Sequence, residues 1–138
     1  MSSLDAIEAK LDAFAVHTDG SDAARSLLAL AEEVLEHWIA ARGETATTQR
    51  REAFRLLALH RQGAQGDPSF NACRETCREI AYHFNLLCLQ PEPGLDAQRQ
   101  RMMVMLTKHL MLFVAGKMRS ERLGEFCCSS RALRAASL

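Results

Sequence analysis

The chain has 138 residues, of which 48% are apolar, 25% are charged and 6% are aromatic. Lysine and arginine together number 17, as do aspartate and glutamate, so the formal net charge is zero. This apolar content excludes a largely disordered chain, and the low numbers of glycine, proline and aromatic residues argue against an all-β fold. Because domains of this length are common, we expect one α-helical domain over residues 1–138, with a frayed C-terminal end.

The apolar stretches predict neither a secretion signal nor a transmembrane span. Asp5, Glu8 and Asp12 interrupt the segment where the apolar core of a signal peptide would lie. The longest apolar run, 102–115, is interrupted by Lys108 and is shorter than the roughly 20 residues that cross a bilayer. Five cysteines cannot all pair within one chain. We therefore expect a reduced, cytoplasmic protein without membrane contact.

The zero net charge conceals a gradient along the chain. Residues 1–44 carry nine acids and three bases, which gives −6. Residues 45–96 carry six of each sign, whereas residues 97–138 carry eight bases and two acids, which gives +6. Such asymmetry can indicate self-association or a charged partner. The alternative is that the acidic and basic segments neutralise each other inside one bundle.

Apolar residues recur at helical spacing through the first half of the chain. The stripe between Leu4 and Val16 predicts a first helix. A second stripe predicts a helix that Ser21 caps and that Gly43 ends, because glycine readily adopts the left-handed conformation found after helices. A third helix is expected over residues 47–62.

The fourth predicted helix has a strong start signal and a regular seam. Asp67 can cap free amides, and Pro68 suits the first helical position because it has no N–H group to leave unpaired. Apolar residues then recur at alternating spacings of three and four, a pattern suited to packing in a bundle. The seam residues are Phe70, Cys73, Cys77, Ile80, Phe84 and Leu87.

The last part of the chain predicts two further helices. A fifth helix, from Asp96 to about Met118, is apolar nearly all round, which is typical of a central or otherwise covered helix. A sixth helix is expected to begin at Ser120. Since the connecting loops are short, we expect an all-α fold: a compact bundle of five to six helices, mostly antiparallel.

Two cysteine pairs are candidates for redox or metal chemistry. Cys73 and Cys77 lie four residues apart on one helix face, and Cys127 and Cys128 are adjacent. Either pair could serve a thiol-based redox or metal sensor. The seam position of Cys73 and Cys77 favours core packing instead, because free cysteine is among the most buried residues. No second ligand pair completes a zinc site, so we expect neither a metal nor a cofactor.

Catalytic motifs are absent from the sequence. It contains no His-Glu-x-x-His, no Gly-x-x-x-x-Gly-Lys and no Gly-x-Ser-x-Gly. The five histidines are scattered, and none forms the Glu-x-x-His pattern of di-iron bundles. We therefore assign no catalytic residue and expect a protein that is not an enzyme.

The fifth predicted helix is the candidate interface. Its methionine-rich apolar surface suits adaptable protein binding, and basic residues near its ends could orient an acidic partner. The candidate residues are Met103, Leu106, Leu110, Phe113, Arg99, Arg101 and Lys117. Whether this helix is core, dimer interface or partner groove stays open at this point.

The leading hypothesis is a small regulatory or adaptor protein that binds another protein and forms a homodimer. An antiactivator or other modulator of a transcription regulator is one example. The alternatives are a thiol-based sensor and a helical small-molecule-binding domain. Arg50, Arg51 and Arg55 could contact phosphates. Because the chain is neutral and has few aromatic residues for stacking, we do not expect direct nucleic-acid binding.

Overall fold

The computed structural model describes residues 2–121, and the all-α prediction is confirmed for them. They form five α-helices and one 3-10 helix, joined by loops. In chain order these are α1 (Leu4–Asp12), α2 (Gly20–Ala41), α3 (Arg55–Ala64), η1 (Pro68–Cys73), α4 (Arg74–Leu89) and α5 (Asp96–Ser120). The sixth helix expected from Ser120 onward falls outside the described residues. Within the described part of the chain, no helix is both long and apolar enough to cross a bilayer.

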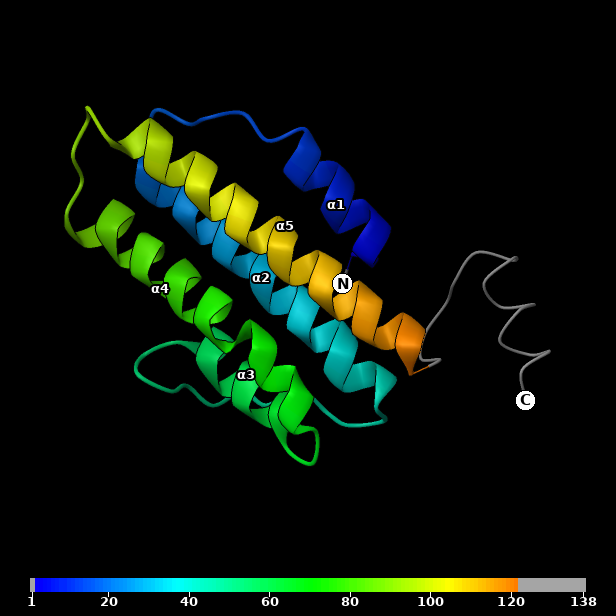
Figure 1. Cartoon of the computed structure of the whole chain (residues 1–138). Coiled ribbons are helices and arrows are strands. Elements are labelled where there is room, and N and C mark those ends of the chain that lie inside the picture. Colours follow the sequence, from blue (N-terminus) through cyan, green and yellow to red (C-terminus); the bar gives the residue numbers. More distant parts are fainter. Residues whose placement is uncertain (1, 122–138) are drawn as a thin grey trace.

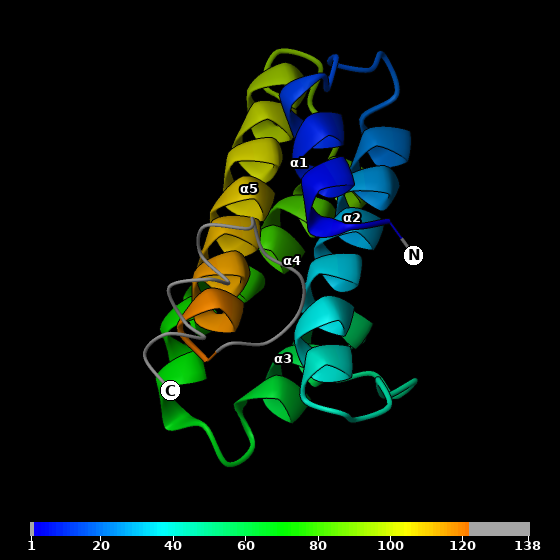
Figure 2. The same cartoon turned by 90° about the vertical axis from the view of Figure 1, so that its right-hand side faces the viewer.

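The two longest helices, α2 and α5, lie side by side and form the centre of the bundle (Figure 1). They run in the same direction, because Gly20 lies beside Asp96 at one end and Lys117 lies over the ring of Trp38 near the other. α4 packs against both of them. α1 covers the opposite side of the α2–α5 pair, away from α3 and α4 (Figure 2).

A pair of stacked aromatic rings fills the end of the bundle near α3. Trp38 of α2 lies flat on Phe70 of η1, with ring centroids 4.8 Å apart and planes 9° from parallel. The indole Nε1 donates a hydrogen bond to the carbonyl of Gly63 at 3.0 Å, so this buried polar group is paired. η1 therefore seals the core between α2, α3 and α4.

The heptad seam is confirmed as the buried face of the fourth helical segment. Phe70, Cys73, Cys77, Ile80 and Leu87 are buried, and Phe84 is half-buried against the core. The segment does not begin as an α-helix, however. Pro68 begins the short 3-10 helix η1, and the carboxylate of Asp67 accepts a hydrogen bond from the Ser69 hydroxyl instead of capping a backbone amide.

Two other helix starts also differ from the sequence prediction. Asp19, not Ser21, is the N-cap of α2, because its carboxylate accepts hydrogen bonds from the Ser21 amide and hydroxyl. The third helix begins at Arg55 instead of residue 47. Gly43 has φ +78°, so the prediction that a left-handed glycine ends α2 is confirmed.

Candidate functional site

The apolar residues proposed as an interface on α5 belong mainly to the core of the chain itself. Met103 and Leu110 are fully buried against neighbouring helices. Leu106 and Phe113 are half-buried, and the Phe113 ring packs 5.5 Å from that of Phe70. In this fold Met103 and Leu110 present no surface to a partner, so the outward side of α5 is formed by other residues.

Lys117, proposed to orient an acidic partner, already has acidic neighbours in its own chain. Its ammonium group lies 2.9 Å from a carboxylate oxygen of Asp67 and 2.6 Å from one of Glu121. It also lies 5.4 Å from the centre of the Trp38 ring. These contacts hold the end of α5 against η1 and leave little of the Lys117 charge for a partner.

The other two basic residues of the candidate interface differ from each other in their surroundings. Arg99 is mostly buried, pairs with Glu92 and Asp96 at 3.5 and 3.8 Å, and donates to the carbonyl of Gln90. It therefore fixes the loop before α5. Arg101 is exposed and makes no ion pair with any described residue.

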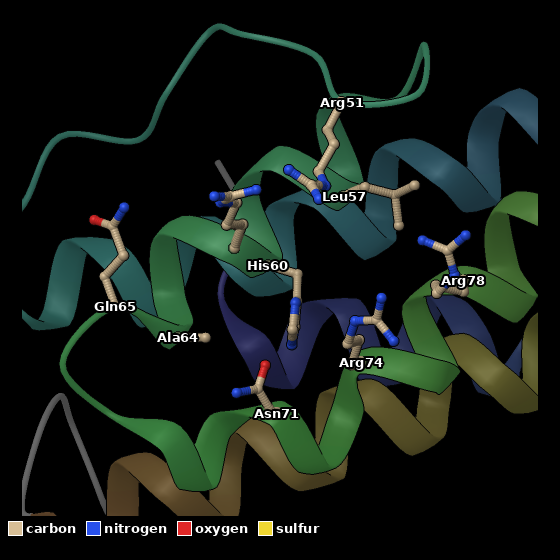
Figure 3. Close-up of a pocket in the computed structure, with 9 residues that line it drawn as sticks. Arg51, Leu57, His60, Ala64, Gln65, Asn71, Arg74 and Arg78 are labelled. Carbon is tan, nitrogen blue, oxygen red and sulfur yellow. The ribbon is translucent and has the colours of Figure 1, made fainter.

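A hollow of about 320 Å³ opens between α3 and the start of α4 (Figure 3). Its walls carry four arginines, two side-chain amides and one histidine, and among the described residues no carboxylate lines it. The lining residues are Arg51, Leu57, His60, Arg61, Ala64, Gln65, Asn71, Arg74 and Arg78. His60 points from α3 into the space between the helices, toward Asn71 and Arg74 on the facing wall.

A second hollow, of about 430 Å³, adjoins the first and shares Arg51, Arg61 and Gln65 with it. It adds Arg50 and further polar side chains, again with no carboxylate among its described lining residues. We call the combined basic surface the arginine face, formed by Arg50, Arg51, Arg61, Arg74 and Arg78. Concentrated positive charge in such hollows attracts and orients anionic groups.

A tight turn places the first two arginines of this face. Residues 51–54 close on themselves through two backbone hydrogen bonds between Arg51 and Phe54, each 2.9 Å long. Glu52 and Ala53 inside the turn have φ values of 52° and 73°, which L-residues adopt at some energetic cost. Arg78 of α4 anchors the turn by donating two hydrogen bonds to the Glu52 carboxylate, and these lower the pKa of Glu52.

The remaining arginines of the face differ in how far nearby carboxylates neutralise their charge. Arg61 makes no ion pair within residues 2–121, and Arg74 has only its exposed neighbour Glu75, at 3.1 Å. Arg55, the third member of the sequence cluster, points elsewhere and pairs with Glu32 and Glu36 at 3.6 and 3.3 Å. Arg50 likewise makes no ion pair with any described residue, so the uncompensated positive charge of the face is concentrated at Arg50 and Arg61, while Arg74 has one exposed partner.

A third hollow, of about 410 Å³, continues the surface on the other side of Arg50, and its lining is mixed, with Arg25, Glu32 and Arg55 beside apolar side chains. Leu28 of α2 lines it together with Phe54 and Phe84, whose rings meet edge to face with centroids 5.6 Å apart. The arginine face thus adjoins a hollow that has both apolar and charged walls. This combination could contact both the charged and the apolar groups of one ligand.

The cysteines of the seam lie in the core and are not among the residues that line the first hollow. Cys73 and Cys77 are buried, as the core-packing interpretation predicts. The Cys73 thiol donates to the carbonyl of Phe70 at 3.3 Å, and His60 Nε2 lies 3.3 Å from the same oxygen. Hydrogen bonds from Cys77 and then His60 lower the pKa of Cys73 to about 6, whereas Cys77 has a raised pKa because of Cys73 and burial.

Two other parts of the redox and metal prediction can be placed. Cys127 and Cys128 lie outside the described residues. Within residues 2–121, no group of three histidine, cysteine, aspartate or glutamate side chains is arranged to hold a metal ion.

The arginine face was not found from the sequence, although its residues were visible there. Arg50 and Arg51 fall in the helix expected over residues 47–62, which begins only at Arg55, and Arg74 and Arg78 lie on a different helix, α4. Helical spacing reveals which residues share one helix, but not that two helices bring their arginines together. Comparisons of the chain with family models, curated proteins and solved structures find no match.

Proposed function

We propose that this protein is a small regulatory or adaptor protein that docks an acidic, amphipathic segment of another protein on the arginine face. The observation that carries this proposal is the pair of adjoining hollows, which five arginines line and no described carboxylate does. Acidic side chains of a partner would pair with Arg61, which makes no ion pair among the described residues, and with Arg74, whose ion-pair partner is the exposed Glu75. The proposal retains the acidic partner expected from the sequence, but its binding site is on α3 and α4 instead of α5.

The apolar side chains of the hollow beside Arg50 favour a protein over a nucleic acid as the partner. Leu28, Phe54 and Phe84 form the apolar part of a hollow of about 410 Å³ next to the basic hollows, which Arg25, Glu32 and Arg55 also line. An amphipathic helix or strand can bury apolar side chains there while its acidic groups contact the arginines. A phosphate backbone has no apolar group for such a depression, and the chain as a whole carries no net positive charge.

A binding experiment with matched charge reversals tests the site. The probe is a fluorescein-labelled peptide with glutamate and leucine at helical spacing, followed by fluorescence anisotropy. We expect the double variant Arg61→Glu/Arg74→Glu to weaken binding at least tenfold, because attraction becomes repulsion at the centre of the face. The control Arg101→Glu/Arg119→Glu changes the net charge equally on exposed positions of α5 and should bind almost like the wild type.

Two outcomes of this experiment would overturn the proposal. Equal losses in both double variants would show that only net charge matters, and a larger loss in the α5 variant would return the site to α5. Duplex DNA of similar length serves as a competitor. If the DNA binds more tightly than the peptide at 150 mM salt, the partner is not an acidic protein segment.

We also propose that the homodimer expected from the sequence forms through the outward side of α5. Met105 and Leu112 are each 54% exposed and share this side with Arg101 and His109. Light scattering of the purified protein should give the mass of two chains, and Met105→Glu/Leu112→Glu should give the mass of one. A wild-type protein that stays monomeric at high concentration would contradict this.

A further inference from the structure

We propose that the docked acidic segment carries a phosphorylated serine or threonine, whose phosphoryl group occupies the hollow between α3 and α4. The inference rests on the docking function proposed above and adds the chemical class of the group that is recognised. It concerns the first basic hollow, of about 320 Å³. The second basic hollow, with Arg50, would contact carboxylates of the same segment.

The arginines of the first hollow come from three separate parts of the fold. Arg51 belongs to the turn before α3, Arg61 to α3, and Arg74 and Arg78 to α4. Arg74 and Arg78 are four residues apart, so they lie on one side of their helix. Figure 3 shows them on the α4 wall of the hollow, with Arg51 on the α3 wall. Guanidinium groups on both walls suit a phosphoryl group, whose three free oxygens can accept hydrogen bonds from several directions.

The hollow reaches inward as far as a buried polar side chain. His60 is 5% exposed and nevertheless lines it. The ring is held in place by the Phe70 carbonyl, which lies 3.3 Å from Nε2 and can only accept a hydrogen bond. Asn71, on the facing wall, adds a side-chain amide that can donate to an oxygen. A group bound here is partly removed from solvent, where hydrogen bonds to a charged group are stronger.

The net charge of the first hollow suits a group with two negative charges. Four arginines line it, and the two carboxylates that pair with them do not. Glu52 pairs with Arg78 at 3.0 Å and lies 4.0 Å from Arg51, whereas Glu75 pairs with Arg74 at 3.1 Å. Four positive and two negative charges leave +2. A phosphomonoester carries about −1.5 to −2 at neutral pH, whereas a carboxylate or a nucleic-acid phosphate carries about −1.

The lining favours serine or threonine over tyrosine as the phosphorylated residue. Among the described residues, Leu57 and Ala64 are its only apolar side chains, and His60 is its only aromatic ring. The walls therefore offer little apolar surface for the ring of a phosphotyrosine. A short side chain also keeps the phosphoryl group near the peptide backbone, so that acidic neighbours can reach the second hollow at the same time.

Three peptides of one sequence test the inference on the full-length protein. They are versions of the fluorescein-labelled acidic amphipathic peptide described above, with serine, glutamate or phosphoserine at the central position. Fluorescence anisotropy gives the Kd of each. We expect phosphoserine to bind roughly tenfold more tightly than serine and roughly threefold more tightly than glutamate, because its charge and its number of acceptor oxygens both exceed those of a carboxylate.

Two arginine variants locate the phosphoryl group. Arg74→Gln removes a guanidinium group of the first hollow, whereas the matched control Arg50→Gln removes one that lines only the neighbouring hollows. Both positions are exposed, so both variants should fold, which circular dichroism verifies. We expect Arg74→Gln to weaken binding of the phosphoserine peptide by a larger factor than binding of the serine peptide. Arg50→Gln should weaken binding of both peptides by the same factor.

The outcomes separate this inference from the docking function. Equal binding of the serine and phosphoserine peptides, or equal losses for both in Arg74→Gln, would overturn the inference and leave the docking function standing. If none of the three peptides binds, the docking function fails together with the inference. Free O-phosphoserine serves as a competitor. Displacement of the phosphoserine peptide at concentrations near the Kd of that peptide would also overturn the inference, because the ligand would then be a small phosphorylated molecule.

Discussion

Gly63 leaves less room for a side chain than the other glycines that the structure describes. A Cβ atom added there would lie 2.8 Å from Cδ1 of Trp38 and 3.1 Å from Cε2 of Phe70. The glycine thus allows α3 to approach the stacked rings closely enough for its carbonyl to accept the indole hydrogen bond. The packing of the bundle end depends on this missing methyl group.

We expect Gly63→Ala to destabilise the protein. Overpacking a rigid core costs about 1–3 kcal/mol, which exceeds the roughly 1 kcal/mol that alanine gains over glycine inside a helix. The urea midpoint of unfolding should therefore fall. Gly116→Ala is the matched control: it is also helical, has open space around its Cα, and should raise stability by about 0.5–1 kcal/mol. A stabilising Gly63→Ala would contradict the packing described here.

Asp67 gives the fold a defined pH dependence. Hydrogen bonds from Ser69 and then Lys117 hold its pKa at about 2, below its ordinary value of 3.8. A carboxylate with a lowered folded-state pKa stabilises the fold above pH 3.8, and this contribution is lost as the pH falls toward 2.

We expect Asp67→Asn to be less stable than the wild type at pH 7, with the difference shrinking as the pH falls from about 5 to about 2. Urea midpoints measured across this range test the prediction. If the difference is independent of pH, ionisation of Asp67 does not contribute and only its hydrogen bonds matter.

At the scale of single elements, the segment before α3 is where the sequence prediction was wrong. Arg55 begins α3, whereas helical spacing had placed the start near residue 47. The Gln62 side chain bonds the Thr47 amide and the Thr45 carbonyl, which satisfies this segment without a helix. Such tertiary hydrogen bonds leave no periodic pattern in the sequence, so they could not be predicted from it.

The turn at residues 51–54 allows a direct test of backbone strain. Ala53 has φ 73°, where glycine avoids the steric cost that an L-residue bears. We expect Ala53→Gly to raise the free energy of unfolding by about 1 kcal/mol. The control Ala58→Gly, inside α3, should lower it by about the same amount. If both substitutions destabilise equally, the turn does not hold the strained conformation.

The behaviour of α5 was predictable in part. An apolar surface all round indicated a covered helix, and this is confirmed, since α2, α4 and α1 all pack against it. Which side of α5 is exposed was not predictable, because apolar residues all round a helix do not indicate the side that faces solvent. The position of α1 and the loop after it determines which side of α5 is covered. The Asp12 carboxylate pairs with Lys108, and the backbone N–H and carbonyl of His17 are hydrogen-bonded to the Gln100 side chain.

For the whole molecule, the charge gradient is only partly neutralised inside the bundle. Asp12 and Lys108 form the one ion pair, among the described residues, between the acidic segment 1–44 and the basic segment 97–138. On α2, Glu32 and Glu36 pair with Arg55, in the neutral middle of the chain, and Asp22 pairs with Arg25 of the same helix. The middle segment, whose formal charge is zero, nevertheless carries the arginine face. The total charge of the segment therefore hid this basic surface, because of its six acids only Glu52 and Glu75 pair with arginines of the face.

The central claim is that an acidic segment docks at the arginine face and not on α5. Amide chemical shifts of the isotope-labelled protein, recorded during a titration with the acidic amphipathic peptide, test it most directly. We predict the largest shifts in and around the hollows, at residues such as Arg51, Arg61, Gln65, Asn71 and Arg74. The largest shifts at Arg101, Met105, His109 and Leu112 would contradict the claim and identify α5 as the binding surface.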